Sequence, residues 1–113
     1  MNDCIFCKII AGEIPSKKVY EDEQALAFYD IAPAAPVHIV IIPKEHALCS
    51  AREIGEHDGA LIAHVFGVIA RLADELHLDG GYRVVTNIGE DAGQTVRHLH
   101  FHLLGGAVLG PMA

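Results

Sequence analysis

Three histidines alternate with apolar residues near the C-terminus of the chain, at His98, His100 and His102. Alternate residues of a β-strand point to one face, roughly 6.6 Å apart. The three imidazoles would therefore form a row, while Leu99 and Phe101 enter the core. A neutral imidazole is a nucleophile and an acid–base catalyst near pH 7. Such a row can bind a metal ion, or it can attack and hold a phosphate.

A short turn precedes this row, and its residue types suit a phosphate group. Gly93, Gln94 and Thr95 supply a glycine, an amide and a hydroxyl. If His100 attacked a phosphorus atom, it would form a phosphohistidine that water then hydrolyses. His102 could hydrogen-bond one non-bridging oxygen, and backbone N–H groups of the turn could hold the other. A metal site made of the three imidazoles is the alternative, because the spacing alone does not exclude it.

Two further candidate ligands lie near the N-terminus, where Cys4 and Cys7 are separated by two residues. Thioredoxin-like redox chemistry needs this motif after a strand in a βαβ unit, and the sequence predicts no such unit. Two cysteines are half of a tetrahedral zinc site, so two histidines must complete it. The alternative is a pair of buried thiols without a metal.

The composition is that of one globular domain, spanning residues 1–113. Of these 113 residues, 51% are hydrophobic and 20% are charged, and the net charge is −7. A chain of this length can bury a core without disulfide staples. The longest basic cluster is Lys17-Lys18, so binding to a nucleic acid polymer would gain little from counterion release. A single phosphate could still bind through backbone amides and histidines.

The sequence also carries information about the compartment. No apolar run reaches the length of a transmembrane helix, and the N-terminus lacks the pattern of a signal peptide, so we expect no membrane association. Three cysteines are an odd number, which argues against a disulfide framework. We therefore expect a cytoplasmic, reducing environment.

The candidate residues must be positioned by a sheet and a long helix. The sequence predicts strands at 19–21, 25–29, 38–42, 82–86 and 97–104, with a hairpin turn at 21–24 and a proline-broken loop at 31–36. It predicts a short helix or turn within 1–12 and a short helix that opens at a capping box at 50–53. The main helix is predicted at about 57–77, with Asp79-Gly80-Gly81 as the signal that terminates it. This order is typical of an α+β domain with a mainly antiparallel sheet.

The main helix carries two apolar stripes. One contains Leu61, Val65, Val68, Leu72 and Leu76, and the other contains Ile62, Phe66, Ile69 and Ala73. A core needs only one stripe. The second indicates either a dimer interface or a wide core face.

Residues 98–104 resemble the His-φ-His-φ-His-φ-φ motif, with φ apolar, that names the histidine triad (HIT) superfamily. Nearly the whole chain is similar to the Hint branch of this superfamily, which consists of nucleotide-binding proteins. The segments that carry the similarity are 3–10, 26–31, 36–38, 42–46 and 93–96. The resemblance implies a HIT-like α+β fold with a five-stranded sheet, and a homodimer in which two sheets form one of ten strands.

The same resemblance implies an activity. Hint-like proteins hydrolyse purine nucleoside 5′-phosphoramidates and related aminoacyl or lysyl adenylates, and release AMP or GMP through a covalent nucleotidyl-histidine. By position, His100 would be the nucleophile, His102 would bind the phosphate and His38 would orient His100. Thr95 stands where the family usually has serine, and it would contact the phosphate or the leaving group.

The resemblance also places a nucleotide site beside these residues. Asn87, Gly93 and Gln94 would belong to its phosphate end, and Asp30 would hold the ribose hydroxyls. The base would contact apolar side chains: Phe6, Ile9, Phe28, Ile31 and Val40. From residue type alone, Asp30 and Asn87 are ordinary turn residues and the apolar residues are ordinary core.

In family members that carry the cysteine pair, the resemblance implies the two missing zinc ligands. They are His46, which follows Ile-Pro-Lys-Glu, and His98, the first histidine of the row. With Cys4 and Cys7 they would form a structural Cys2His2 zinc site that takes no part in the chemistry. Cys49 is a conceivable ligand in place of His98. We expect no organic cofactor.

The tail after Gly105-Gly106 departs from the family pattern, because it lacks the usual arginine and tryptophan. That tail influences amine selectivity in Hint-like dimers, so the leaving group is not fixed by the resemblance. Three alternative functions follow: a dinucleoside polyphosphate hydrolase of the Fhit-like branch, a nucleotide-binding regulatory or scaffold protein with incidental hydrolysis, and a metalloenzyme. The cysteine pair and the short tail argue against the Fhit-like branch.

Overall fold

The structure, a computed structural model, describes residues 4–112 and arranges their strands in one five-stranded sheet. Asp3, the first residue of the segment 3–10 that carries the family similarity, lies outside the described residues, as do positions 1, 2 and 113. The strands are β1 (Lys18–Glu21), β2 (Ala25–Tyr29), β3 (Val37–Pro43), β4 (Arg83–Val85) and β5 (Phe101–Gly105). Their order is β1-β2-β3-β5-β4, and every neighbouring pair is antiparallel. The expected α+β class is confirmed.

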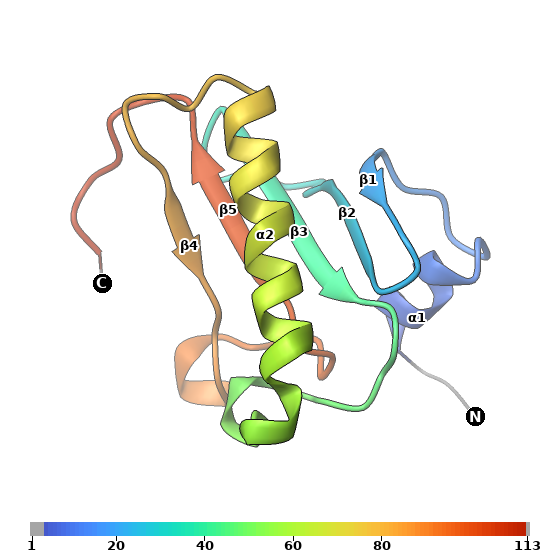
Figure 1. Cartoon of the computed structure of the whole chain (residues 1–113). Helices are drawn as coiled ribbons and strands as arrows, with labels where there is room; N and C mark the ends of the chain where they lie inside the picture. Colours follow the sequence, from blue (N-terminus) through green and yellow to red (C-terminus); the bar gives the residue numbers. More distant parts are fainter. Residues whose placement is uncertain (1–3, 113) are drawn as a thin grey trace.

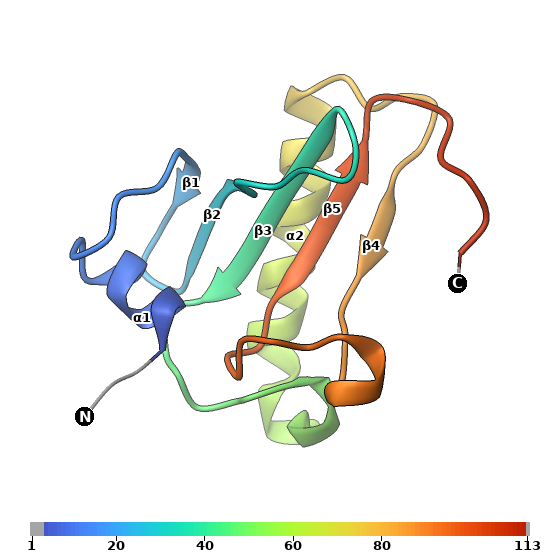
Figure 2. The ribbon, with the colours of Figure 1, turned by 180° about the vertical axis from the view of Figure 1, so that it is seen from behind.

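Helices lie on both faces of this sheet. The helical segments are α1 (Ile5–Ile10), η1 (Ala51–Glu53), η2 (Glu56–Asp58), α2 (Gly59–Glu75) and η3 (Glu90–Ala92). The long helix α2 crosses one face over β3 and β5 (Figure 1), and α1 lies on the opposite face near one end of the sheet (Figure 2). Within residues 4–112, none of the helices is long and apolar enough to cross a membrane.

Strand β3 is buried on both faces, because α1 and α2 cover it from opposite sides. Its unbroken β-branched run before Pro43 is typical of such a strand. Ile39 and Ile41 belong to the larger core cluster under α2. Val40 and Ile42 belong to a second cluster, together with Ile9 of α1. The alternation of side chains therefore places His38, which has the parity of Val40, on the α1 face of the sheet.

The long helix is shorter than predicted at both ends. A single 3₁₀ turn, η2, precedes it, and it ends at Glu75, before the expected end at residue 77. His77 adopts the left-handed conformation with φ 59°, and its N–H donates to Asp74 O. The N–H of Leu78 donates to Ala73 O, which completes a Schellman motif. The buried side chain of Leu78 explains why the chain turns there, before it reaches the glycines.

Both apolar stripes of α2 contribute to the core. Val65, Val68 and Leu72 of the first stripe are buried, and so are Ile69 and Ala73 of the second. Part of the second stripe is therefore the edge of a wide core face. Phe66 of this stripe is 44% exposed.

The capping box predicted at residues 50–53 forms with a shift of one residue. Ser50 Oγ accepts a hydrogen bond from the N–H of Arg52, as an N-cap should. Glu53, however, accepts from the N–H of Cys49 at 2.7 Å and not from that of Ser50. The segment that follows is one 3₁₀ turn, η1, and no longer helix develops.

The last strand begins four residues later than predicted. The sequence predicts a strand from Arg97, but β5 starts at Phe101, so His98 and His100 precede the sheet ladder. The reason is that this segment bonds elsewhere: Leu99 N–H donates to Leu48 O, and Thr86 Oγ1 donates to His100 O at 2.7 Å. The alternation of faces still holds, since Leu99, Phe101 and Leu103 all enter the core under α2.

Asp22 joins the β1–β2 hairpin to α2 through hydrogen bonds. Its Oδ1 accepts from the N–H groups of Gln24 and Ala25 at 2.7 and 2.8 Å. Its Oδ2 accepts from the Tyr20 hydroxyl and from Nε2 of His64, both at 2.7 Å. Desolvation raises the pKa of Asp22, but these hydrogen bonds outweigh it and hold the pKa well below its ordinary value of 3.8.

We expect Asp22→Ala to lower the free energy of unfolding by roughly 1–3 kcal/mol, because it leaves four donors without their acceptor. Lys18→Ala, which breaks an exposed ion pair with Glu21, should change it by less than about 0.5 kcal/mol. Since the pKa of Asp22 is lowered on folding, its contribution is complete above pH 3.8 and is lost as the pH falls below that value. Urea unfolding at pH 7 and pH 3 measures both effects. Equal midpoints for the two variants at pH 7 would contradict this role of Asp22.

Candidate active site and metal-binding cluster

Three histidines meet on the α1 face of the sheet, where β3 and β5 pair. His102 lies opposite Val40, and His38 lies opposite Leu104, so the two histidines are diagonal neighbours on adjacent strands. His100 comes just before β5, and its ring centroid lies 5.2 Å from that of His102. The fold thus brings together three of the four residues predicted to be catalytic.

The position of the ring proton of His100 is fixed by a backbone carbonyl. Its Nδ1 lies 2.7 Å from the carbonyl oxygen of His98. Because a carbonyl can only accept, Nδ1 must carry the proton, and in the neutral ring Nε2 keeps its lone pair. Burial lowers the pKa of His100 below its ordinary value of 6.5. The ring therefore stays neutral at pH 7, with Nε2 as a nucleophile.

A second chain of hydrogen bonds fixes the proton of His102. The N–H of Ala34 donates to Nδ1 of His38 at 3.0 Å, so a neutral His38 carries its proton on Nε2. That Nε2 lies 2.8 Å from Nδ1 of His102 and donates to it. His102 is then left with a proton on Nε2. The partner of His38 is His102, whereas the sequence-based expectation was that His38 orients His100.

Asp30 lies next to this chain. Its Oδ2 is 3.5 Å from Nε2 of His38, and its Oδ1 accepts from the N–H of Ala32 at 2.8 Å. The backbone N–H of Asp30 also donates to His38 O. These contacts place a carboxylate at the edge of the histidine cluster.

His102 is held in its neutral form. Burial lowers its pKa to about 4, with smaller effects from His100 and His38. Protonation of Nδ1 would also remove the lone pair that accepts from His38.

This shift makes the stability of the fold depend on pH. Unfolded His102 binds a proton near pH 6.5, whereas folded His102 binds one near pH 4, so stability is lost as the pH falls between these values. Over this range we expect the wild type to lose on the order of 1–3 kcal/mol more than His102→Asn. Chemical denaturation at pH 6.5 and pH 4.5 measures it. Comparing the wild type with His102→Asn cancels the contributions of the other titrating groups. An equal loss of the free energy of unfolding in both proteins would contradict the expectation.

The apolar residues predicted to contact a base form one cluster, with a single exception. Ile9, Phe28 and Val40 are buried together between α1 and the sheet, and Phe6 packs against them. The Phe6 ring also meets the His100 ring edge-on, at a centroid distance of 5.0 Å. Ile31 is fully exposed and stands outside this cluster.

The predicted phosphate turn is a loop that follows β4. Thr95 is exposed, and Asn87 is half-buried. The N–H of Gly93, which was expected to face the phosphate, donates to Glu90 O within the η3 turn at 2.9 Å. The side-chain amide of Gln94 accepts a hydrogen bond from Gly89 N–H and donates to the carbonyls of Cys49 and Val96.

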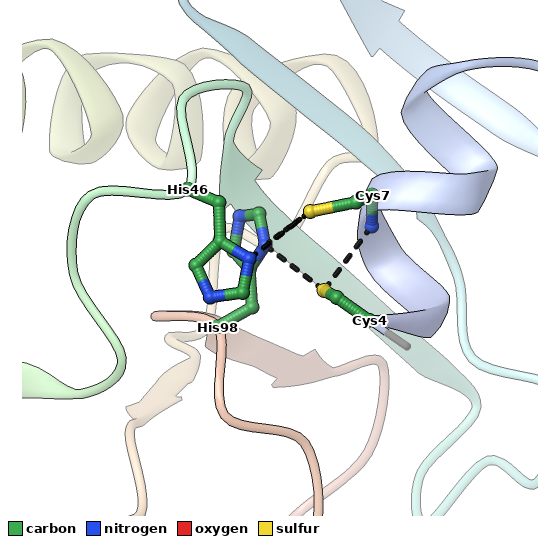
Figure 3. Close-up of side chains that lie close together, drawn as sticks. All are labelled: Cys4, Cys7, His46 and His98. Atoms are coloured by element: carbon green, nitrogen blue, oxygen red, sulfur yellow. Dashed lines mark hydrogen bonds between the residues drawn. The ribbon is translucent and has the colours of Figure 1, made fainter. Parts of the chain in front are cut away.

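The four predicted metal ligands converge at one point beside α1 (Figure 3). Nδ1 of His98 lies 3.3 Å from Cys4 Sγ and 3.5 Å from Cys7 Sγ, and Nδ1 of His46 lies 3.1 Å from Cys7 Sγ. All four ligand atoms lie within 4.8 Å of one another. In a tetrahedral zinc site with bonds of 2.0–2.3 Å, ligand atoms are roughly 3.3–3.8 Å apart. The arrangement therefore fits a zinc ion.

The protons of this cluster are also arranged for a metal. Nε2 of His98 donates to Pro43 O, and Nε2 of His46 donates to Arg97 O, both at 2.7 Å. Each carbonyl holds the proton on Nε2 and leaves the Nδ1 lone pair for a metal, as in known second shells.

In a second group of possible metal ligands, hydrogen bonds do not leave the nitrogen lone pairs for a metal. Within the described residues, Asp30, His38 and His102 also lie close enough to share a metal ion. However, the N–H of Ala34 occupies Nδ1 of His38, so the nitrogen that would face a metal carries a proton. In this group the hydrogen bond places a proton on the nitrogen that a metal would need, whereas the Cys2His2 cluster could hold a metal.

Several residues of the site could not be found from the sequence. Thr86 donates to the carbonyl of His100, and Ala34, Pro43 and Arg97 act through backbone atoms. A backbone contact depends on the fold and leaves no signature in residue type. Only Thr86, at the end of a predicted strand, has a side chain that could have suggested a role.

Comparison with known proteins decides the family. The sequence model of the HIT domain matches residues 11–108. The chain belongs to the HIT family. An uncharacterized HIT-like protein of Rickettsia prowazekii is 48% identical over 106 residues, which are 93% of this chain and 88% of that protein. Protein HitA of Neisseria gonorrhoeae is 42% identical over 105 residues, which are 93% of this chain and 97% of that protein.

Solved structures of HIT proteins have the same fold. A HIT family hydrolase from Clostridium thermocellum has a TM-score of 0.93 and 48% identity, and the match covers 99% of this chain and 97% of that one. A histidine triad nucleotide-binding protein from Candida albicans has a TM-score of 0.80 and 38% identity, covering 98% of this chain and 85% of that one. The HIT fold is thus established for this chain.

Proposed function

We propose that this protein hydrolyses purine nucleoside 5′-phosphoramidates, including adenylyl-amines and aminoacyl or lysyl adenylates. The proposal rests on the ring protons of His100 and His102, whose positions are each fixed by a hydrogen bond. His100 keeps a lone pair on Nε2 because its Nδ1 proton is bound to His98 O. His102 keeps a proton on Nε2 because its Nδ1 accepts from His38. The site offers one nucleophile and one donor side by side.

The proposed reaction has two steps. In the first, Nε2 of His100 attacks the α-phosphorus, and the bond from phosphorus to the leaving group breaks. A phosphoramidate nitrogen leaves as the amine after taking a proton from solvent, whereas an aminoacyl adenylate releases a carboxylate. In the second, water attacks the nucleotidyl-histidine, the bond from phosphorus to Nε2 of His100 breaks, and a proton from the water returns to solvent as the nucleoside monophosphate leaves. The Nε2–H of His102 donates a hydrogen bond to a phosphoryl oxygen and stabilises the charge that develops there. The exposed hydroxyl of Thr95 would contact the phosphate or the leaving group.

The nucleoside would lie along the apolar cluster of α1. Asp30 offers the carboxylate for the ribose hydroxyls, at the edge of the histidine cluster. Phe6 presents its ring beside His100, and the exposed side chain of Ile31 gives an apolar surface that a base could cover. These contacts support a nucleotide as the substrate and do not distinguish adenine from guanine.

We also propose that Cys4, Cys7, His46 and His98 bind a structural zinc ion, which would supply rigidity to the N-terminal segment. Support comes from the donor types, the distances and the two carbonyl-bound Nε2 protons. Thiolate ligands persist in a reducing compartment, which supports a cytoplasmic location.

A homodimer is the proposed state of assembly. Strand β4 is at the edge of the sheet, and Phe66 of α2 is 44% exposed, so both elements offer surface for a second copy. Sedimentation at micromolar concentration tests this, with a monomer as the contradicting result.

Steady-state hydrolysis of a fluorogenic adenosine 5′-phosphoramidate tests the proposed function. We expect turnover with release of AMP and amine in equal amounts. A dinucleoside polyphosphate, assayed in parallel, distinguishes the Fhit-like alternative. Tight nucleotide binding without hydrolysis of either compound would favour a binding protein.

A further inference from the structure

The segment between Gly89 and Val96 is closed into a loop by one residue, Gln94. Its backbone N–H donates to Gly89 O at 3.1 Å, and the N–H of Gly89 donates to Gln94 Oε1 at 2.9 Å. These two bonds join the ends of the η3 turn. Gly89 and Gly93 have φ angles of 84° and 85°, and glycine loses much conformational entropy when it is fixed. The double contact with Gln94 maintains this shape.

The amide nitrogen of Gln94 ties the loop to the rest of the protein. Its Nε2 donates to Val96 O at 3.0 Å and to Cys49 O at 2.7 Å. Because Nε2 meets two carbonyls and Oε1 meets an N–H, the reverse orientation of the amide would oppose like groups. Both N–H groups are therefore engaged by protein acceptors, and neither is left for a phosphate.

We propose that Gln94 is a positioning residue for the substrate phosphate: it holds the loop that presents Thr95 and does not itself contact the nucleotide. This inference rests on the proposed function and changes the role expected for Gln94. Thr95 is the next residue along the chain and is exposed. Since the loop is also bonded to Cys49 O, Gln94 sets the place of Thr95 relative to the body of the protein.

Gln94→Glu tests this role with little change in volume. The new side chain keeps an acceptor for Gly89 N–H, but it sets a carboxylate oxygen against the carbonyls of Cys49 and Val96. We expect the affinity for AMP to fall about tenfold while the affinity for adenosine stays unchanged, because only AMP has the phosphate. Titration calorimetry with the two compounds gives the ratio.

The matched control is Gln24→Glu, which makes the same change of charge in the exposed hairpin turn. It should bind AMP and adenosine as the wild type does. If Gln94→Glu binds AMP with wild-type affinity, the inference is wrong. An equal loss of AMP and adenosine affinity would also overturn it, since that result indicates general damage to the nucleotide site.

A measurement on the wild type keeps the inference testable if the variant fails to fold. In NMR spectra, both side-chain amide protons of Gln94 should exchange slowly with solvent, with and without AMP. A nuclear Overhauser effect between these protons and bound AMP would show direct contact and overturn the inference. Wild type that binds AMP but does not hydrolyse the phosphoramidate would reject the proposed function alone, because the AMP-to-adenosine ratio would still test Gln94.

Discussion

His100→Ala is expected to abolish hydrolysis of the adenosine phosphoramidate, with a loss on the order of 10⁴-fold or more in kcat. The variant loses the nitrogen that forms the covalent bond, and water is left as the only nucleophile. Its fold should persist, because the backbone contacts of this segment, Leu99 N–H to Leu48 O and Thr86 Oγ1 to the carbonyl of residue 100, do not need the imidazole. AMP should still bind, since His102 and its partner His38 are intact.

The covalent intermediate gives an independent measurement. Wild type mixed with substrate and denatured at alkaline pH, where a phosphohistidine survives, should gain the mass of one nucleotidyl group, located on His100 by peptide mapping. His57→Ala is the control, because His57 is an exposed histidine in η2 and is not a member of the histidine cluster. Full turnover by His100→Ala, or a label on another histidine, would contradict the proposed mechanism.

Removal of the proposed zinc ion should produce the second large effect, on stability and not on the chemistry. The α1 helix has six residues, and its N-cap is Cys4, so the Cys2His2 cluster is a main attachment of this segment. We expect Cys7→Ser, or a strong chelator, to lower the free energy of unfolding by on the order of 3–5 kcal/mol. For a domain of this size, that lowers Tm by at least about 10 °C.

Metal analysis and thermal unfolding test this together. We expect one zinc per chain in the wild type and in Cys49→Ser, whose cysteine is outside the cluster, and none in Cys7→Ser. Brief chelation should leave most of the turnover at 20 °C. If chelation removed turnover and left Tm unchanged, the metal would belong to Asp30, His38 and His102, and the protein would be a metalloenzyme.

Much of the fold follows from local patterns that tertiary structure did not override. Alternation in the segment after Arg97 placed the histidines on one face and Leu99 in the core, even though β5 is shorter than predicted. The spacing of apolar residues gave α2, and the β-branched run before Pro43 gave a strand buried on both faces. These features depend on residues that are close in sequence.

What could not be predicted depends on residues that are distant in sequence. The partner of His38 is set by the register of β3 against β5, across 64 positions. The end of α2 is set by the burial of Leu78 in a core made by other elements. The proton positions of His98 and His46 are set by backbone carbonyls, which every residue type possesses. No pattern of residue types encodes these contacts.

The strand order has a consequence for synthesis of the chain on the ribosome. Strand β5 is the last of the five to be made, yet it lies between β3 and β4 in the sheet. Until Gly105 has emerged, one edge of β3 lacks its neighbour, and β4 pairs with nothing in the sheet. His98, His100 and His102 emerge with or just before the same strand. Nascent chains that end before it lack His100 and His102 and hold an incomplete Cys2His2 cluster, so the proposed site is assembled only after the sheet is closed.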